Sequence, residues 1–194
     1  MRRIAIVNVA FACAILWTHH IADAVPGASH YKKRAGVITF SVANSTPLSE
    51  AQLQAYQAEV RNEYLHAWNA YKTYAFGADE LQPISKEPGY SRNGWGATIV
   101  DGLDTAIIMG LTDELPLFRS HIANISWLQP GPGGSQECQI FETLIRYLGG
   151  LLSAHDLTQD DLYLTKAKKL ADQVLMPAFK GEGNLPYRFV KIGT

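Results

Sequence analysis

The pattern of hydrophobic and polar residues predicts a chain built mainly from helices. From residue 50 to 76, apolar residues recur at steps of three or four, the period of one helix face. They are Leu53, Tyr56, Val60, Tyr64, Ala67, Tyr71 and Ala75. Gly77 predicts the end of this helix. Little of the chain alternates with period two, so we expect few strands.

Similar patterns predict four further helices, at residues 98–110, 112–128, 140–155 and 158–179. Thr112 and Thr158 are the expected N-cap residues, because each precedes acidic residues of a first turn. Segments 78–97 and 129–136 are rich in glycine and proline and are predicted loops. This all-α order indicates antiparallel helix pairs. It fits a helical bundle, a solenoid or a helical barrel.

Composition supports a globular domain and excludes one class of partner. The 194 residues are 47% hydrophobic and 18% charged, with a formal net charge of -1. No stripe interleaves basic with aromatic residues in the manner of nucleic-acid-binding proteins, so we expect no nucleic-acid partner.

The N-terminus predicts a secretory signal peptide at residues 1–24. Arg2 and Arg3 precede an apolar run at residues 4–17, and Ala22-Asp23-Ala24 fits the small-x-small cleavage rule. A spanning helix needs about 20 residues, so we expect no membrane anchor after cleavage. Residues 25–48 are a predicted polar lead-in, and 49–194 form the folded region. Asn44 and Asn124 begin glycosylation sequons that agree with the secretory route, secreted or in the endoplasmic reticulum or Golgi lumen.

Glu142 and Arg146 are the first candidates for chemistry. They lie four residues apart, on one helix face, within "IFETLIRYLGGLLSAH". Charged residues are rarely buried unless they are paired or functional. One reading is a carboxylate whose protonation is tuned by a guanidinium, as a general acid requires. The other is a salt bridge on a helix flank.

Loop and helix residues supply further candidates. Asp101, Asp104 and Thr105 share one side of a predicted helix. The two carboxylates would bind sugar hydroxyls or hold a cation through water; alternatively, Asp101 would cap the helix start. Asp79 and Glu80 lie in a predicted loop, as substrate ligands or as a solvated turn. Trp95, between two glycines, is a candidate for stacking on a sugar. The sequence lacks the motifs of zinc, nucleotide and serine-nucleophile sites.

Three blocks together resemble class I α-1,2-mannosidases, glycoside hydrolase family 47, of the secreted fungal type. The blocks are "AWNAYKTYAFGADELQPIS", "NGWGATIVDGLDTAIIMGL" and "FETLIRYLGGLLSAHDLT", and "LADQVLMPAF" followed by "GNLPY" resembles the next one. The resemblance implies an (α/α)7 barrel, of which this chain would hold a truncated N-terminal part. It also implies inverting hydrolysis of α-1,2-linked mannose in high-mannose N-glycans, with Ca²⁺ as cofactor.

The resemblance also implies roles for single residues. Glu142 matches the proposed general acid, and Arg146 the residue that orients acid and substrate. Asp101 and Asp104 match a sugar-site motif, and Asp79 and Glu80 a segment near the cleft. Phe76 and Ala78 depart from the tryptophan and histidine of many relatives.

The resemblance also predicts which residues would follow Thr194 in the family. The catalytic base and the calcium ligands are expected there, so we expect the 194-residue chain by itself to be an inactive fragment. Cys138, the one cysteine after the signal peptide, would be a free thiol or lack a partner. One alternative function is a mannose-binding, non-hydrolytic quality-control lectin. Another is a secreted helical domain whose Glu142–Arg146 pair is structural.

Overall fold

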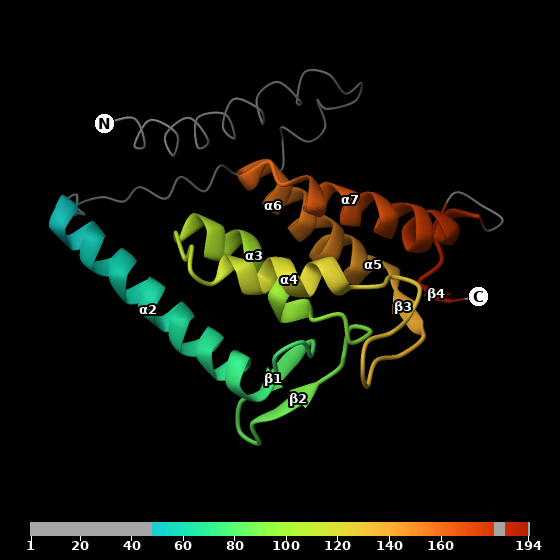
Figure 1. Ribbon diagram of the computed structural model, residues 1–194, viewed down its shortest axis with the longest axis horizontal. Helices are drawn as coiled ribbons and strands as arrows, with labels where there is room; N and C mark the ends of the chain where they lie inside the picture. Colours follow the sequence, from blue (N-terminus) through green and yellow to red (C-terminus); the bar gives the residue numbers. More distant parts are fainter. Residues whose placement is uncertain (1–47, 181–184, 194) are drawn as a thin grey trace, which may run out of the picture. The chain divides into compact units, whose positions relative to one another are not determined.

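The computed structural model describes residues 48–180 and 185–193. The predicted signal peptide, nearly all of the lead-in segment and the Asn44 sequon lie outside these residues. The described region is mostly helical (Figure 1), as the periodicity predicted. Its α-helices are α2 (Glu50–Tyr74), α3 (Ala97–Ile108), α4 (Leu115–Asn124), α5 (Ile140–Glu142), α6 (Gly149–Thr158) and α7 (Asp161–Leu170). None of the described helices is long and apolar enough to cross a membrane.

Two of the predicted helices contain turns that are wider or tighter than an α-helix. A π-helical segment, Thr143–Leu148, joins α5 to α6 in one continuous helical run. After α7 the chain continues through a π-helical segment, Ala171–Leu175, and a 3-10 turn, Met176–Phe179. The predicted helix at 140–155 therefore exists and extends to Thr158.

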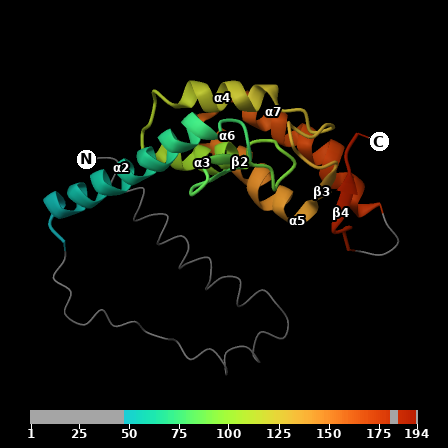
Figure 2. The same cartoon turned by 90° about the horizontal axis from the view of Figure 1, so that it is seen from below.

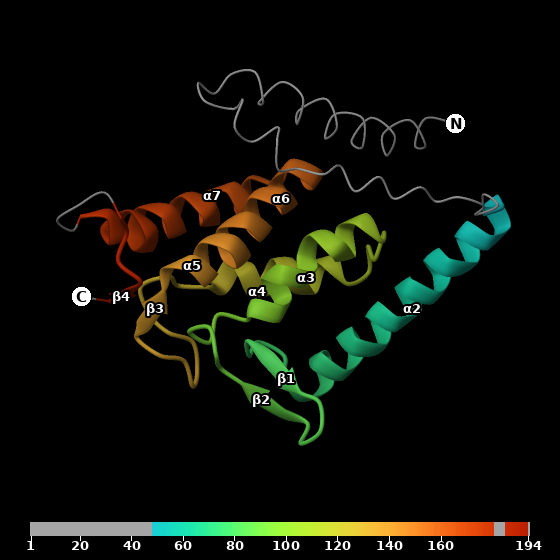
Figure 3. The ribbon, with the colours of Figure 1, turned by 180° about the vertical axis from the view of Figure 1, so that it is seen from behind.

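Helix α2 begins with a capping box. The Ser49 side chain accepts a hydrogen bond from the Gln52 backbone N–H, and the Gln52 side chain accepts one from the Ser49 N–H. Of the predicted apolar stripe, only Tyr71 and Ala75 are buried in the core, and Tyr64 is partly buried against it. Ala67 is exposed, and its neighbour Trp68 is buried instead. Figures 1 and 3 show the first half of α2 diverging from α3 and α4. There the stripe residues Leu53, Tyr56 and Val60 are exposed.

Both predicted N-cap threonines are wrong, because the chain turns later than the local pattern indicates. Thr112 lies in a turn, and α4 begins at Leu115 after Glu114. Thr158 is the last residue of α6. The α7 cap is Asp160, whose extended backbone lets its side chain accept from the Leu162 N–H at 2.9 Å.

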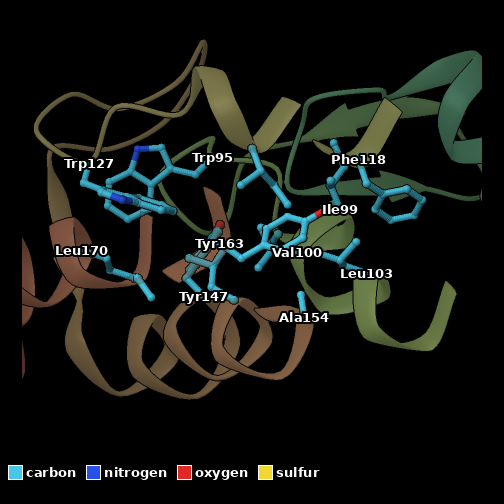
Figure 4. Close-up of a cluster of buried hydrophobic side chains, with 14 of the residues drawn as sticks. Trp95, Ile99, Val100, Leu103, Phe118, Trp127, Tyr147, Ala154, Tyr163 and Leu170 are labelled. Atoms are coloured by element: carbon cyan, nitrogen blue, oxygen red, sulfur yellow. The ribbon is translucent and has the colours of Figure 1, made fainter. Parts of the chain in front are cut away.

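The helices α3, α4, α6 and α7 pack against one another around one apolar core (Figures 1 and 2). A two-residue connection between α6 and α7 makes them an antiparallel pair. Figure 4 shows the cluster, with Trp95 and Trp127 toward one end and Leu103 and Phe118 toward the other. All four of these side chains are at most 2% exposed.

Gly150 allows α3 and α6 to approach closely. A Cβ atom at Gly150 would lie 2.8 Å from the Val100 carbonyl oxygen, which is closer than real Cβ atoms come. The glycine therefore brings the α3 face that carries Asp101 next to the helical run that carries Arg146.

Four short strands complete the described fold, two of them within a predicted loop and two outside every predicted element. β1 (Glu80–Gln82) and β2 (Glu87–Gly89) form an antiparallel hairpin within the predicted loop 78–97. β3 (Glu137–Gln139) pairs with β4 (Phe189–Lys191), with Cys138 opposite Val190. Strands of three residues are too short to show an alternation of apolar and polar positions.

Candidate active site

Glu142 and Arg146 form a direct ion pair along the helical run 140–158. Glu142 ends α5, and Arg146 lies one turn later in the π-helical segment. Arg146 Nε donates to Glu142 Oε2 at 2.5 Å. The Glu142 side chain is only 17% exposed, so the pair lies at the edge of the core.

Arg146 also bridges to α3. Its Nη1 atom donates to Asp101 Oδ2 at 2.7 Å, across the contact that Gly150 makes possible. One guanidinium therefore holds two carboxylates from different helices. The predicted candidates Asp101, Glu142 and Arg146 are thus brought together by the fold.

A fourth member of this group was missed by the sequence analysis. Arg92, in the loop after β2, places its Nε atom 3.3 Å from Glu142 Oε2. Arg92 and Glu142 are distant in sequence, and no helical or strand spacing links a loop residue to such a partner. We refer to Arg92, Asp101, Glu142 and Arg146 as the carboxylate–guanidinium cluster.

The cluster favours the charged forms of Glu142 and Arg146. The hydrogen bond from Arg146 is the main cause that lowers the pKa of Glu142, partial burial opposes it, and Arg92 adds to the lowering. The hydrogen bonds to Glu142 and Asp101 raise the pKa of Arg146. Glu142 is therefore ionised at neutral pH in this arrangement.

Asp104 faces the same helical run as Asp101. Its Oδ2 atom accepts from Ser153 Oγ at 2.9 Å, and its Oδ1 atom from Thr105 Oγ1 at 3.5 Å. The carboxylate is partly buried. The spacing of three residues placed both aspartates on one side of a helix, and in the structure both contact residues of the run 140–158.

Asp79 is a structural residue, which corrects its prediction as a substrate ligand. The residue is 2% exposed. Its two carboxylate oxygens accept hydrogen bonds from four backbone N–H groups, those of Arg92, Gly94, Gly96 and Ala97. The phenol oxygen of Tyr147 lies 3.2 Å from Oδ1. Asp79 therefore shapes the loop that carries Arg92 and the start of α3.

Trp95 is also buried, which corrects the prediction that it stacks on a sugar. Its side chain is 2% exposed, and its Nε1 atom donates to the Gln129 carbonyl oxygen at 2.8 Å. Its ring centroid lies 5.0 Å from that of Trp127 and 5.5 Å from that of Tyr147, both edge to face. The flanking Gly96 has φ +80°, a backbone conformation that glycine adopts readily, and the resulting turn directs the indole inward.

Glu80 stays at the surface, next to a small cavity. Its Oε2 atom accepts from Ser91 Oγ at 3.1 Å, and the residue is exposed. The cavity, of about 150 Å³, is lined by Asp79, Glu80, Ser91, Arg92, Ala97, Thr98, Asp101 and Arg146. It brings Glu80 to the same hollow as three members of the carboxylate–guanidinium cluster, Arg92, Asp101 and Arg146.

Asn124, the described glycosylation candidate, is an exposed residue at the end of α4. Its amide nitrogen donates to the Ser120 carbonyl oxygen at 2.9 Å. It borders a separate hollow of about 380 Å³ that also includes Phe76 and His121. The hollow is apart from the cluster, since none of the four cluster residues lines it.

The described residues do not form a calcium site. Among residues 48–180 and 185–193, no group of three or more His, Cys, Asp or Glu side chains is placed to hold a metal ion. The carboxylates near the cluster are already engaged, Asp101 and Glu142 by guanidinium groups and Asp79 by backbone N–H groups. Calcium prefers several free oxygen ligands, which these engaged carboxylates do not offer.

Comparison with known proteins identifies relatives with the expected chemistry. A probable mannosyl-oligosaccharide α-1,2-mannosidase 1B from Neosartorya fischeri is 40% identical over 159 residues, covering 76% of this chain and 31% of the relative. An endoplasmic reticulum mannosyl-oligosaccharide 1,2-α-mannosidase from Schizosaccharomyces pombe is 41% identical over 140 residues, covering 71% of this chain and 26% of the relative. The chain thus spans less than a third of the length of these two relatives.

A solved structure supports the same relationship. An α-1,2-mannosidase from Trichoderma reesei matches with a TM-score of 0.68 and 35% identity, covering 72% of this chain and 31% of that one. The expected architecture, part of an (α/α)7 barrel, is confirmed by this match and by the helical fold. Residues 63–194 match the family described as Glycosyl hydrolase family 47, which is more than half of the chain. The chain therefore belongs to glycosyl hydrolase family 47.

Proposed function

We propose that the protein hydrolyses α-1,2-linked mannose of high-mannose N-glycans with inversion, and that this chain supplies the general acid, Glu142. Family membership and the names of the relatives support this reaction class. The observation that carries the proposal is the setting of Glu142, a partly buried carboxylate held by Arg146 beside Asp101. Such a setting fixes the orientation of an acid, which catalysis requires.

The reaction can be followed atom by atom. Glu142, once protonated, donates its proton to the glycosidic oxygen while the bond from that oxygen to the anomeric carbon breaks. A water molecule attacks the anomeric carbon from the opposite face and gives its proton to a general base. Inverting enzymes place the two carboxyl groups about 6.5–9.5 Å apart so that this water fits. We assign no base among the described residues.

The resting charge of Glu142 raises the question of how it gains a proton. Arg146 keeps it ionised in this arrangement. Sugar hydroxyl groups that accept hydrogen bonds from Arg146 would weaken its bond to Glu142. The pKa of Glu142 would then rise, because a weaker bond to the charged form favours that form less. Substrate binding and protonation of the acid would be coupled in this way.

The remaining polar residues are proposed substrate ligands. Asp101 and Asp104 offer carboxylate oxygens along α3, and Glu80 borders the small cavity. Ionised carboxylates accept hydrogen bonds from sugar hydroxyl groups. Arg146 would orient both the acid and the sugar.

We also propose that the protein enters the secretory pathway. A signal peptide at residues 1–24 and glycans at Asn44 and Asn124 fit entry into the secretory pathway. The exposure of Asn124 supports its use as an acceptor, and a relative from Schizosaccharomyces pombe is named for the endoplasmic reticulum. Calcium binding by residues after Thr194 stays a prediction.

Replacement of Glu142 tests the function. In the full-length gene product, Glu142→Gln should lower the rate of mannose release from a high-mannose glycan by about 10²–10⁴-fold, the usual range for a general acid. Glu59→Gln is the matched control, since it removes the same charge from an exposed position of α2. Circular dichroism of each variant checks that the fold is kept. A folded Glu142→Gln variant that retains the full rate would refute the assignment.

The lectin alternative is not favoured, because the relatives that match the chain are named as mannosidases. The same samples separate the two functions. A lectin would bind the high-mannose glycan without releasing mannose, and Glu142→Gln would leave that binding unchanged.

A further inference from the structure

Arg92 is fixed in place by buried polar groups. Its backbone N–H donates to Asp79 Oδ2 at 2.7 Å, and its carbonyl oxygen accepts from Tyr147 Oη at 3.0 Å. Asp79 and Tyr147 are both buried. Tyr147 directly follows Arg146, so the same π-helical segment positions both arginines that contact Glu142.

The Arg92 side chain contains an unusual atom. Its Nη1 atom donates to the Ser91 carbonyl oxygen at 2.9 Å. Its Nε atom is buried and lacks a hydrogen-bond partner, the single such side-chain nitrogen or oxygen within the described part of the chain. Native proteins rarely leave a buried donor without a partner, and such exceptions often mark functional groups. The nearest acidic atom is Glu142 Oε2, at 3.3 Å.

The two oxygens of Glu142 have different surroundings. Oε2 contacts both Arg146, from its own helical run, and Arg92, from the loop after β2. The third charged group nearby is Asp101 on α3, which contacts Arg146. No hydrogen bond to Oε1 exists within residues 48–180 and 185–193, whereas Oε2 accepts one from Arg146.

We propose that Arg92 is a positioning residue for Glu142, which holds Oε2 together with Arg146 and so leaves Oε1 to carry the proton that reaches the glycosidic oxygen. This inference rests on the proposed function. Two cations on one oxygen orient the carboxyl group more tightly than one can. They also make the acidity of Glu142 depend on a loop residue 50 positions earlier in the chain.

The first experiment measures the coupling without any catalysis. The carboxyl carbon of Glu142 is followed by NMR through a pH titration of the 194-residue chain. Arg92→Gln should raise the pKa of Glu142, because it removes a positive charge that favours the ionised form. Arg92→Lys should restore part of the lowering, since it keeps the charge without the fork of donors.

Arg119→Gln is the matched control. Arg119 forms a comparable ion pair with Asp160, at 2.6 Å, on other elements of the fold. This substitution should raise the pKa of Asp160 and leave that of Glu142 unchanged. A folded Arg92→Gln variant in which Glu142 titrates as in the unsubstituted chain would overturn the proposal.

The second experiment measures catalysis by the full-length gene product. Arg92→Gln should lower the maximal kcat by about 10- to 100-fold, the cost of a misplaced catalytic group. It should also move the basic limb of the pH–rate profile upward, because an acid with a higher pKa stays protonated to higher pH. A role of Arg92 in folding alone would leave that limb in place.

The conservative variant decides the outcome if Arg92→Gln does not fold. Arg92→Lys with reduced kcat and only a small rise in the pKa of Glu142 supports a positioning role, whereas unchanged kcat refutes it. A different result is expected if Glu142 is not the general acid. Glu142→Gln would then retain the rate of mannose release, while the effect of Arg92 on the pKa of Glu142 would persist in the NMR titration.

Discussion

The phenol oxygen of Tyr147 lies 3.2 Å from Asp79 Oδ1, and this contact joins two parts of the chain that are 68 residues apart. The same phenol is 3.0 Å from the Arg92 carbonyl oxygen. Burial and the nearby charge of Asp79 both raise the pKa of Tyr147, so the phenol keeps its proton and remains a donor. The contact therefore ties the helical run 140–158 to the loop that carries Arg92.

Asp79→Ala should strongly destabilise the fold. The substitution removes the acceptor of four backbone N–H groups in and next to the loop. Buried donors without an acceptor are costly, so we expect the free energy of unfolding to fall by roughly 3–5 kcal/mol. Urea denaturation measures the change. Glu80→Ala is the control, and this exposed residue should alter stability by less than about 0.5 kcal/mol. Equal effects of the two substitutions would contradict the structural role of Asp79.

Gly149 and Gly150 should respond in opposite ways to alanine. Gly150→Ala places a Cβ atom 2.8 Å from the Val100 carbonyl oxygen and should destabilise the fold by about 1–3 kcal/mol. At Gly149 the nearest atom is the Leu144 carbonyl oxygen, at 3.8 Å. Gly149→Ala should therefore be neutral or should stabilise by about 0.5–1 kcal/mol, the usual preference for alanine in a helix. Thermal unfolding of both variants is the measurement, and a stability loss at Gly149 alone would disprove the close approach of α3 and α6.

The stability of the fold should depend on Glu114 in acid. Hydrogen bonds from Lys72 Nζ and Trp68 Nε1 lower the pKa of Glu114 from its ordinary value of 4.5. The stabilising effect is thus complete above pH 4.5 and is lost as pH falls through the lower pKa of the folded state. Glu114→Gln should be less stable than the parent chain at neutral pH, and the difference should shrink in acid. Urea midpoints at several pH values measure it, and a difference that is the same at every pH would argue against the ion pair.

Cys138 should react slowly with thiol reagents in the folded chain. It is a fully buried residue of strand β3, opposite Val190 of β4, with its Sγ atom 3.0 Å from Thr143 Oγ1. Burial raises its pKa, and thiol reagents attack the thiolate. Labelling with a maleimide should be slow in buffer and fast in denaturant. Rapid labelling of the folded chain would show that this region opens.

The helices were predictable because their signal is local. The apolar stripe of α2, the run from Ile140 and the helix before Phe179 repeat at steps of three or four, and each of these helices exists. The contact between Glu142 and Arg146 was predictable for the same reason, since a helix places residues four apart on one face. Capping depends on where the chain turns, which the packing of the helices decides, so Thr112 and Thr158 were wrong.

The candidate site was only partly predictable because most of it is non-local. Trp95 and Asp79 lie in a segment whose glycines and prolines are typical of an exposed loop, yet both side chains are buried. A turn at Gly96 directs Trp95 inward, and four backbone N–H groups donate to Asp79. The joining of Arg146 to Asp101 and of Arg92 to Glu142 spans 45 and 50 residues. Periodicity determines which face of a helix is apolar, whereas only tertiary packing determines which faces meet. The residues of helices and pairs within one helix turn therefore follow from sequence, but a cluster drawn from a loop and two helices exists only once the chain has folded.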